Sequence, residues 1–172
     1  MQLSDKDILK EIKNGNIKIE PRLKKDQIGS GSIDLTLSNE FWFIKKEFEN
    51  KLVDLKKIES KDIFQKITAN SVVLAPSQLC LGVTKEKITL APNIMGRLEG
   101  RSRYARIGLA VHVTSSLVQP GCSNRQVLEI VNFAPYSIKL YSGMRISQIC
   151  LSYTAQPTQK PYKKFGKIAK NQ

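Results

Sequence analysis

Residues that bind metals or form disulfides are scarce in this chain of 172 residues, which contains three cysteines and one histidine. Cys80, Cys122 and Cys150 are odd in number and widely spaced, so they do not resemble a disulfide framework. With His112 as the one imidazole and no Cys-x-x-Cys pair, a tetrahedral zinc site would lack ligands. We therefore expect neither a disulfide-stabilised scaffold nor a resident metal site.

Long apolar runs are also absent, and none reaches the length that spans a membrane. The first residues are charged, where a signal peptide would have an apolar region. We expect a single domain over residues 1–172, large enough to bury a core, that is soluble and cytoplasmic and has no membrane partner.

Acidic residues are few, because 15 Asp and Glu stand against 28 Lys and Arg, which gives a net charge of +13. Such an excess indicates an anionic partner or substrate. Nucleic acid would suit scattered basic residues with exposed aromatics, whereas a nucleoside triphosphate needs only a local cluster. Much of the excess is lysine in 45–66 and 160–170, which can equally be solvated surface, so charge alone leaves these readings open.

Short β-prone runs dominate the pattern after one N-terminal helix. The helix is predicted over 4–15, because Ser4 can cap it, Asp7 stands at the capping-box position and Gly15 can end it. The β-prone runs, separated by Pro, Gly, Asn and Ser, are 32–37, 41–44, 71–74, 79–83, 87–90, 108–113, 127–131, 137–140 and 146–153. Residues 45–70 are charged, and we expect an excursion with a short helix there. Many closely spaced strands predict an all-β barrel or sandwich with few helices.

The segment Gly100-Arg-Ser-Arg-Tyr-Ala-Arg106 and the carboxylate Glu129 are the strongest functional signal. A helix predicted over 102–107 would point free N–H groups at an anion that Arg101 and Ser102 attract. Glu129 lies in an apolar strand, and a buried carboxylate needs a partner, for which Arg101 and Arg106 are the candidates. A carboxylate held in this way can do general acid–base work. The alternatives are a simple turn at Gly100 and an ion pair that only links strand to helix.

Several well-known catalytic arrangements are missing. Zinc-dependent nucleobase deaminases need a His-x-Glu and a Pro-Cys-x-x-Cys, and neither occurs. A Walker-type glycine-rich loop is absent as well. His112 lies between two valines, and we interpret it as a structural residue of a strand rather than as part of a catalytic triad.

A series of motifs runs through nearly the whole chain. Four of them are Gly100-Arg-Ser-Arg-Tyr-Ala-Arg106-x-Gly-Leu, Val111-His-Val-Thr114, Pro120-Gly121 and Val127-Leu-Glu-x-x-Asn132. The others are Leu3-Ser-Asp-x-x-Ile8, Gly31-Ser-Ile-Asp-Leu35, Gly143-Met-x-Ile-x-Gln148 and Pro161-Tyr162. In content and order these motifs resemble the dCTP deaminases of the dUTPase-like trimeric superfamily.

The resemblance implies a mainly β fold, namely a distorted β-barrel of the dUTPase-like (β-clip) type with a short N-terminal helix. It implies a homotrimer with active sites between subunits, and a mobile C-terminal lid over residues 155–172. The reaction would be hydrolytic deamination of dCTP to dUTP and ammonia without zinc, with Mg²⁺ accompanying the triphosphate. The resemblance also suggests dTTP as a feedback inhibitor, and it gives no reason to expect nucleic acid as a partner.

Residue roles follow from the same resemblance. Glu129 would take a proton from a water over C4 of cytosine and return it to N3 and the leaving amine. Ser102 and Arg106 would hold that water and the carboxylate. Substrate contacts would come from Arg101, Arg103, Thr114, Ser115, Gln119, Val127, Leu128, Gln148, Tyr162, Lys167 and Gln172.

Three positions depart from the family pattern. The family usually has an acidic residue where Gln119 stands and an aromatic residue where Cys122 stands, and Leu117 replaces an arginine of single-activity deaminases. Because Gln119 is neutral, it cannot act as a base, which argues against triphosphate hydrolysis. Three hypotheses remain: a dCTP deaminase; a dUTPase or bifunctional enzyme that forms dUMP; and a non-enzymatic nucleotide- or nucleic-acid-binding protein on the same scaffold.

Overall fold

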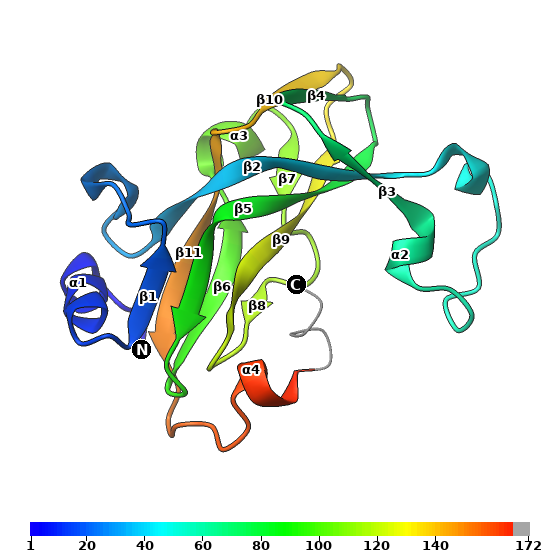
Figure 1. Ribbon diagram of the computed structural model, residues 1–172. Helices are drawn as coiled ribbons and strands as arrows, with labels where there is room; N and C mark the ends of the chain where they lie inside the picture. The colour runs from blue at the N-terminus through cyan, green and yellow to red at the C-terminus, as the bar shows by residue number, and fades with distance from the viewer. Residues whose placement is uncertain (167–172) are drawn as a thin grey trace.

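A curled sheet forms the body of the molecule in a computed structural model, which describes residues 1–166 (Figure 1). Nine strands belong to this sheet and two more, β4 and β10, form a separate ribbon. The expectation of a mainly β fold with few helices is confirmed. The sheet curls around a core of apolar side chains from several strands, including Leu35, Phe41, Ile88, Leu128 and Ile149.

The element bounds are as follows. The strands are β1 (Ile17–Glu20), β2 (Ile33–Ile44), β3 (Phe64–Thr68), β4 (Ser71–Leu74), β5 (Leu79–Leu90), β6 (Ile94–Gly100), β7 (Leu109–Val111), β8 (Leu117–Val118), β9 (Ser123–Asn132), β10 (Ile138–Tyr141) and β11 (Arg145–Tyr153). The helices are α1 (Asp5–Lys13), α2 (Ser60–Ile63), α3 (Ser102–Ala105) and α4 (Tyr162–Phe165), with 3-10 turns η1 (Lys25–Gln27) and η2 (Lys46–Phe48).

Helix α1 has the N-terminal cap that the sequence predicts. The Ser4 hydroxyl accepts from the Asp7 N–H at 3.3 Å, and the Asp7 carboxylate accepts from the Ser4 N–H at 3.0 Å. The Ser4 hydroxyl also donates to the Asp7 carboxylate at 2.7 Å, and this hydrogen bond, together with the one from the Ser4 N–H, lowers the pKa of Asp7. Ile8 is fully buried and anchors the helix to the core, while Gly15 takes the left-handed backbone (φ +76°) that follows the helix end.

Strand order separates the two parts of the sequence that carry the functional signal. The sheet runs β7-β9-β5-β2-β11-β6-β8, so β9 lies beside β7 and β5, whereas β6 lies beside β11 and β8. Along β9 burial alternates, with Leu128 and Ile130 in the core and Val127 and Glu129 half-buried on the other face. β9 and β6 are therefore far apart in strand order, but the curl of the sheet brings the end of β6 beside β7, where Gly100 lies next to Val111.

Four strands were not predicted from the sequence: β1, β3, β6 and β8. The two predicted runs 79–83 and 87–90 are one strand, β5, with an irregularity in its pairing to β9 between Val83 and Lys87. The expected excursion is present, and Figure 1 shows α2 and its flanking loop projecting from the body of the molecule. Besides its short helix it contains β3, which pairs with the end of β2.

Candidate active site

The first half of the candidate site is a pocket around Arg101, which we call the arginine pocket. Its lining residues come from the η1 turn, β2, β11 and the start of α3, and they are Asp26, Gly29, Ser32, Asp34, Arg101, Ser102, Arg103 and Gln148. The pocket has a volume of about 400 Å³. It thus brings together four residues that the sequence singled out: Arg101, Ser102, Arg103 and Gln148.

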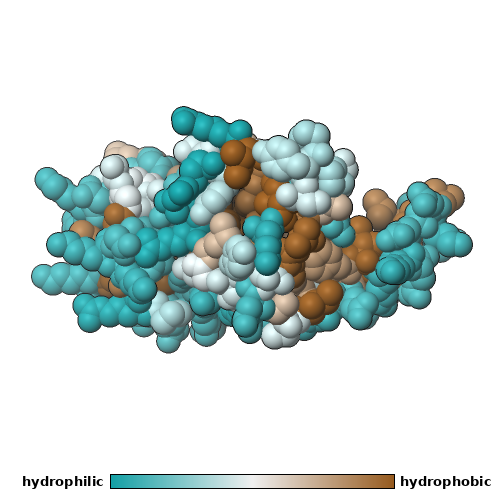
Figure 2. All heavy atoms as spheres, turned by 90° about the horizontal axis from the view of Figure 1, so that it is seen from above, coloured by the Kyte–Doolittle hydropathy of each residue, from teal (hydrophilic) through white to brown (hydrophobic). Residues whose placement is uncertain are grey.

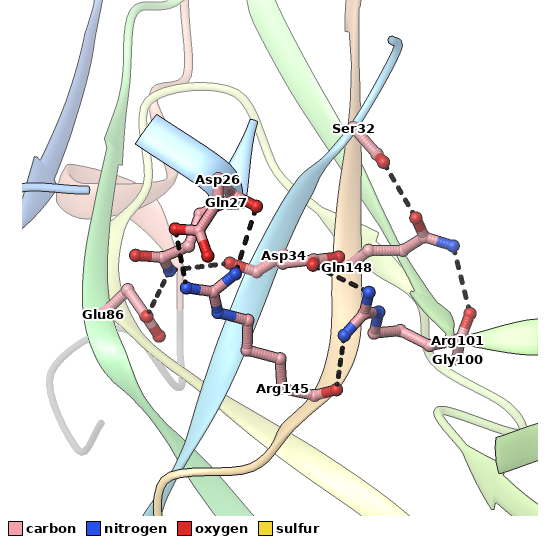
Figure 3. A network of polar contacts seen from close by, with 9 residues as sticks. All are labelled: Asp26, Gln27, Ser32, Asp34, Glu86, Gly100, Arg101, Arg145 and Gln148. Carbon is pink, nitrogen blue, oxygen red and sulfur yellow. Dashed lines mark hydrogen bonds and ion pairs between the residues drawn. The ribbon is translucent and has the colours of Figure 1, made fainter. Parts of the chain in front are cut away.

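Arg101 follows directly after β6, and its guanidinium is held from two other strands (Figure 3). One nitrogen, Nη2, lies 3.0 Å from the Asp34 Oδ2 atom on β2. The other, Nη1, donates to the main-chain carbonyl of Arg145 on β11 at 3.1 Å. The expectation that Arg101 pairs with Glu129 in the same chain is therefore wrong, because Asp34 takes that place.

Gln148 has both ends of its side-chain amide occupied. The Ser32 hydroxyl donates to Gln148 Oε1 at 2.8 Å, and Gln148 Nε2 donates to the Gly100 carbonyl at 3.1 Å (Figure 3). These bonds orient the amide across β2 and β6, and they leave its second N–H available. Gln148 therefore faces the pocket in a fixed orientation.

Helix α3 presents the remaining residues of the arginine segment to solvent. It spans Ser102–Ala105, two residues shorter than predicted. Ser102, Arg103 and Arg106 are exposed. Arg103 lies over the Tyr104 ring, 5.3 Å from its centroid. Arg106 takes part in no ion pair within the described residues, so it is free to contact a ligand or another chain.

Glu129 lies in the second half of the site and is held by Thr114. Its Oε2 atom accepts from the Thr114 hydroxyl at 2.8 Å and from the Thr114 N–H at 3.2 Å. The side chain is half-buried, so the full burial expected from the sequence is not observed. Within residues 1–166 neither Arg101 nor Arg106 pairs with it.

Strand β7 separates Arg106 from Glu129 inside one chain. The His112 N–H, just past β7, donates to the Glu129 carbonyl at 2.8 Å. Leu109, at the other end of β7, pairs with Asn132, and Arg106 at the end of α3 precedes it by three residues, whereas Ser102 at the start of α3 lines a pocket together with His112. Three strand residues span about 10 Å, which places the α3 end well away from the Glu129 carboxylate.

His112 is not a strand residue as predicted, because β7 ends at Val111. It has a left-handed backbone (φ +62°), which is uncommon for a residue other than glycine. Among the side-chain atoms described, its Nδ1 is buried without a hydrogen-bond partner. Burial lowers the pKa of His112, although the nearby Glu129 carboxylate opposes that shift.

A second pocket of about 200 Å³ lies beneath the loop that follows His112, and we call it the loop pocket. It is lined by Leu98, His112, Ser115, Leu117, Val118, Gln119, Cys122, Asn124, Gln126, Val127 and Tyr162. Four of the predicted substrate contacts therefore meet here: Ser115, Gln119, Val127 and Tyr162. Asn124 and Gln126 were not among the predicted substrate contacts, and their period-2 placement on β9 puts both side chains on its buried face.

Two other residues of this region, Leu128 and Cys122, have buried side chains. The Leu128 side chain is fully buried in the core, so any contact with a ligand would have to come from its main chain. Cys122 is buried too, and desolvation raises the pKa of its thiol to about 12, which keeps it protonated and unreactive.

The C-terminal segment reaches the loop pocket by main-chain contacts. The Tyr162 N–H donates to the Pro120 carbonyl and the Lys163 N–H to the Gly121 carbonyl, each at 3.0 Å. Gly121 has φ +73°, and a Cβ atom on it would lie 2.9 Å from the Pro161 Cα. Glycine is therefore required where the segment docks. Lys167 and Gln172, which the sequence predicts as substrate contacts, lie outside the described residues.

The described residues contain no group of three or more His, Cys, Asp and Glu side chains placed to hold a metal ion. The carboxylates that line the arginine pocket are those of Asp26 and Asp34. Nor does any helix of residues 1–166 have both the length and the apolar character needed to cross a membrane.

Comparison with known proteins matches residues 2–154 to the model of a family described as dCTP deaminase-like. A protein from a Marinomonas species named dCTP deaminase is 36% identical over 173 residues, which cover 95% of this chain and 89% of the relative. A dCTP deaminase from Buchnera aphidicola is 37% identical over 94% of this chain and 89% of its own length. A Parafrankia protein named dCTP deaminase, dUMP-forming, is 36% identical over 94% of this chain and 81% of its own length.

Solved structures agree with the fold. The 2′-deoxycytidine 5′-triphosphate deaminase from Agrobacterium tumefaciens superposes with a TM-score of 0.67 at 19% identity, covering 89% of this chain and 48% of that one. The dUTPase of Staphylococcus aureus phage phi11 gives a TM-score of 0.55 at 12% identity over 88% of this chain and 98% of that one. The family match spans the strands that carry both halves of the site, from Ser32 to Gln148. This chain belongs to the dCTP deaminase-like family.

Proposed function

We propose that this protein hydrolyses dCTP to dUTP and ammonia without zinc. The observation that carries the proposal is the Glu129 carboxylate, which Thr114 orients and which lies on the same face of β9 as Val127 of the loop pocket, in a chain of the dCTP deaminase-like family. A carboxylate fixed by a hydroxyl and a main-chain N–H is suited to accept a proton in one defined direction. Cytosine would lie with its C4 atom near this group.

In the proposed mechanism Glu129 takes a proton from a water molecule as that water attacks C4 of the base. That proton passes to N3, and the proton of the new C4 hydroxyl then passes to the exocyclic amine, so that the C4–N bond breaks and ammonia leaves as the C4 carbonyl forms. Ser102 and Arg106 would hold the water and the carboxylate, and Arg101 and Arg103 would bind the triphosphate. With no metal ion to acidify the water, the fixed base and its positioned donors would lower the barrier.

Two copies of the chain would be needed to bring these groups together. Arg106 is exposed and separated from Glu129 by β7 within one chain. Beside α3, Ile107, Phe133 and Tyr136 are exposed at 48%, 66% and 53%. Figure 2 looks down on the end of the molecule that carries α3 and shows apolar groups gathered near its centre. Such exposed apolar surface is typical of a protein interface, which supports the homotrimer with active sites between subunits.

Mg²⁺ would accompany the triphosphate. The two carboxylates of the arginine pocket, Asp26 and Asp34, are each paired with an arginine, so the ion would be held by oxygens of the triphosphate and by water. When bound, the ion would neutralise phosphate charge. The proton transfers belong to Glu129 and the groups around it.

The test is to incubate the protein with dCTP and Mg²⁺ and to follow ammonia and all nucleotide products together. dUTP and ammonia in equal amounts are expected. Absence of turnover, with Glu129→Gln binding dCTP as the wild type does, would refute the enzymatic proposal. Salt-dependent DNA binding in the same preparation would then favour a non-enzymatic role.

A bifunctional enzyme that forms dUMP is the second candidate, because two relatives at 36% and 35% identity are named dCTP deaminase, dUMP-forming. Such an enzyme also cleaves the triphosphate, which requires a base to activate a second water. Gln119 lines the loop pocket and is neutral, so it does not supply that base. Pyrophosphate and dUMP in the assay would establish this candidate in place of the first.

A further inference from the structure

The arginine pocket contains a half-buried carboxylate, that of Asp34, which would repel a phosphate through space. Asp34 lines the pocket together with Arg101 and Arg103, and its side chain is only 15% exposed. Asp26 lines the same pocket but is 73% exposed and pairs with Arg145 at 3.0 Å. A negative charge so close to a bound anion lowers affinity unless it contributes in another way.

Asp34 contributes by holding Arg101. Its Oδ2 atom lies 3.0 Å from Arg101 Nη2, while the Arg145 carbonyl accepts from Nη1 at 3.1 Å (Figure 3). The two acceptors stand on the neighbouring strands β2 and β11, so the guanidinium is fixed at both terminal nitrogens. A guanidinium has five N–H donors, and those not used by these acceptors remain for a ligand.

We infer that Asp34 is a positioning residue, which orients the Arg101 guanidinium toward the triphosphate and raises affinity without touching the ligand. The assignment of a triphosphate to this pocket rests on the proposed function. An arginine whose side chain is already ordered loses less conformational entropy when the anion binds. The gain from this order must exceed the repulsion between Asp34 and the phosphates.

Three roles for Asp34 predict different results when the side chain is removed. If Asp34 acted only through its charge, its removal would tighten anion binding. If it acted only as a ligand of Mg²⁺, its removal would weaken binding only when Mg²⁺ is present. As a positioning residue, it weakens binding with and without Mg²⁺ when removed.

The experiment measures binding of inorganic triphosphate to the full chain by calorimetry, once in EDTA and once in Mg²⁺. We expect Asp34→Ala to weaken binding about tenfold in both, as for a lost hydrogen bond to a charged group. Asp34→Asn keeps an acceptor oxygen and should recover part of the loss. Asp26→Ala is the matched control, since it removes an exposed carboxylate of the same pocket, and it should bind at least as tightly as the wild type.

A double-variant cycle tests whether Asp34 acts through Arg101. In an Arg101→Ala background, Asp34→Ala should cause no further weakening. Thermal unfolding checks that each variant folds. If Asp34→Ala does not fold, Asp34→Asn takes its place, and it too should bind triphosphate more weakly than the wild type in EDTA and in Mg²⁺. Binding that is unchanged or tighter in EDTA, or a full additional loss in the Arg101→Ala background, overturns the inference.

The outcome is separable from that of the proposed function, because binding of inorganic triphosphate does not require deamination. If dCTP is deaminated, Asp34→Ala should raise KM and leave kcat within about twofold.

Discussion

The arginine pocket and the surroundings of Glu129 differ in how much of their geometry one chain supplies. Arg101 is fixed by Asp34 and by a main-chain carbonyl, and Gln148 is fixed at both ends of its amide. Glu129 is held by Thr114 alone among the described residues, and Thr114 itself lies in an exposed loop. One region is built from adjacent strands, whereas the other depends on a loop and a half-buried strand face.

The difference indicates a division of labour. Asp34 and the Arg145 carbonyl hold Arg101 from two adjacent strands. The arginine pocket, which is the proposed phosphate site, is therefore ordered before a ligand binds. In the proposed mechanism, Arg106 and Ser102, which face solvent, would have to meet a carboxylate that lies past β7. Binding is thus expected to be a property of one chain, and catalysis a property of the assembly.

The largest effect on the rate is expected when Glu129, the proposed proton acceptor, is replaced. We expect Glu129→Gln to reduce deamination of dCTP by about 10²- to 10⁴-fold, because the amide cannot accept a proton. Affinity for dCTP should stay close to that of the wild type, since the arginine pocket is intact. Rates by ammonia release and affinity by calorimetry check this, and normal turnover would remove Glu129 from the mechanism.

Removing Arg106 tests whether catalysis depends on a residue that lies away from Glu129 within one chain. Arg106→Ala should lower kcat about 100-fold, as loss of a donor at the reacting centre does. This effect is expected although Arg106 forms no ion pair within the described part of its own chain. Arg22→Ala, which removes another exposed arginine, is the matched control and should leave the rate unchanged. Equal rates in both variants would contradict the role of Arg106.

The single hydroxyl that holds Glu129 gives a smaller effect. Thr114→Val removes the 2.8 Å hydrogen bond to Oε2, and we expect kcat to fall about tenfold with KM little changed. Thr114→Ser restores the hydroxyl and should restore most of the rate. If Thr114→Ser is as slow as Thr114→Val, the hydroxyl does not orient the carboxylate.

The smallest expected effect concerns stability and His112. Burial places the pKa of His112 below its ordinary value of about 6.5, so the unfolded chain binds the proton at higher pH than the folded chain does. Folded-state stability is therefore lost as pH falls below about 6.5 toward the lower folded pKa.

His112→Asn tolerates the left-handed backbone and does not titrate. Between pH 7.5 and pH 5 its Tm should fall less than that of the wild type, by a difference of about 3 °C or less. Scanning calorimetry at both pH values measures this. An identical pH dependence in the two proteins would show that the pKa of His112 is the same in the folded chain as in the unfolded chain.

The sequence was sufficient for the elements whose signals are local. The cap of α1, the strand 127–131 within β9 and the start of α3 all follow from residues within a few positions of one another. β6 was not predicted, because its residues Ile94–Gly100 include two glycines and two charged groups, and it owes its place to pairing with β11.

The candidate site shows the same limit. Arg101, Ser102 and Glu129 could be singled out from their residue types, but the partner of Arg101 could not. Asp34 lies 67 positions earlier in the chain and meets Arg101 only because β2, β11 and β6 are adjacent in the sheet. Likewise the left-handed backbone of His112 depends on how β7 ends, and no local residue pattern indicates it.

The most direct test of the division between binding and catalysis is to mix two inactive variants. Glu129→Gln and Arg106→Ala chains are unfolded together in equal amounts, refolded, and assayed for ammonia release from dCTP. If each site takes Glu129 from one chain and Arg106 from another, roughly a quarter of the sites regain both residues, and the mixture recovers about that fraction of the wild-type rate. A mixture no faster than the average of the two variants would show that both residues act within one chain and would contradict the account.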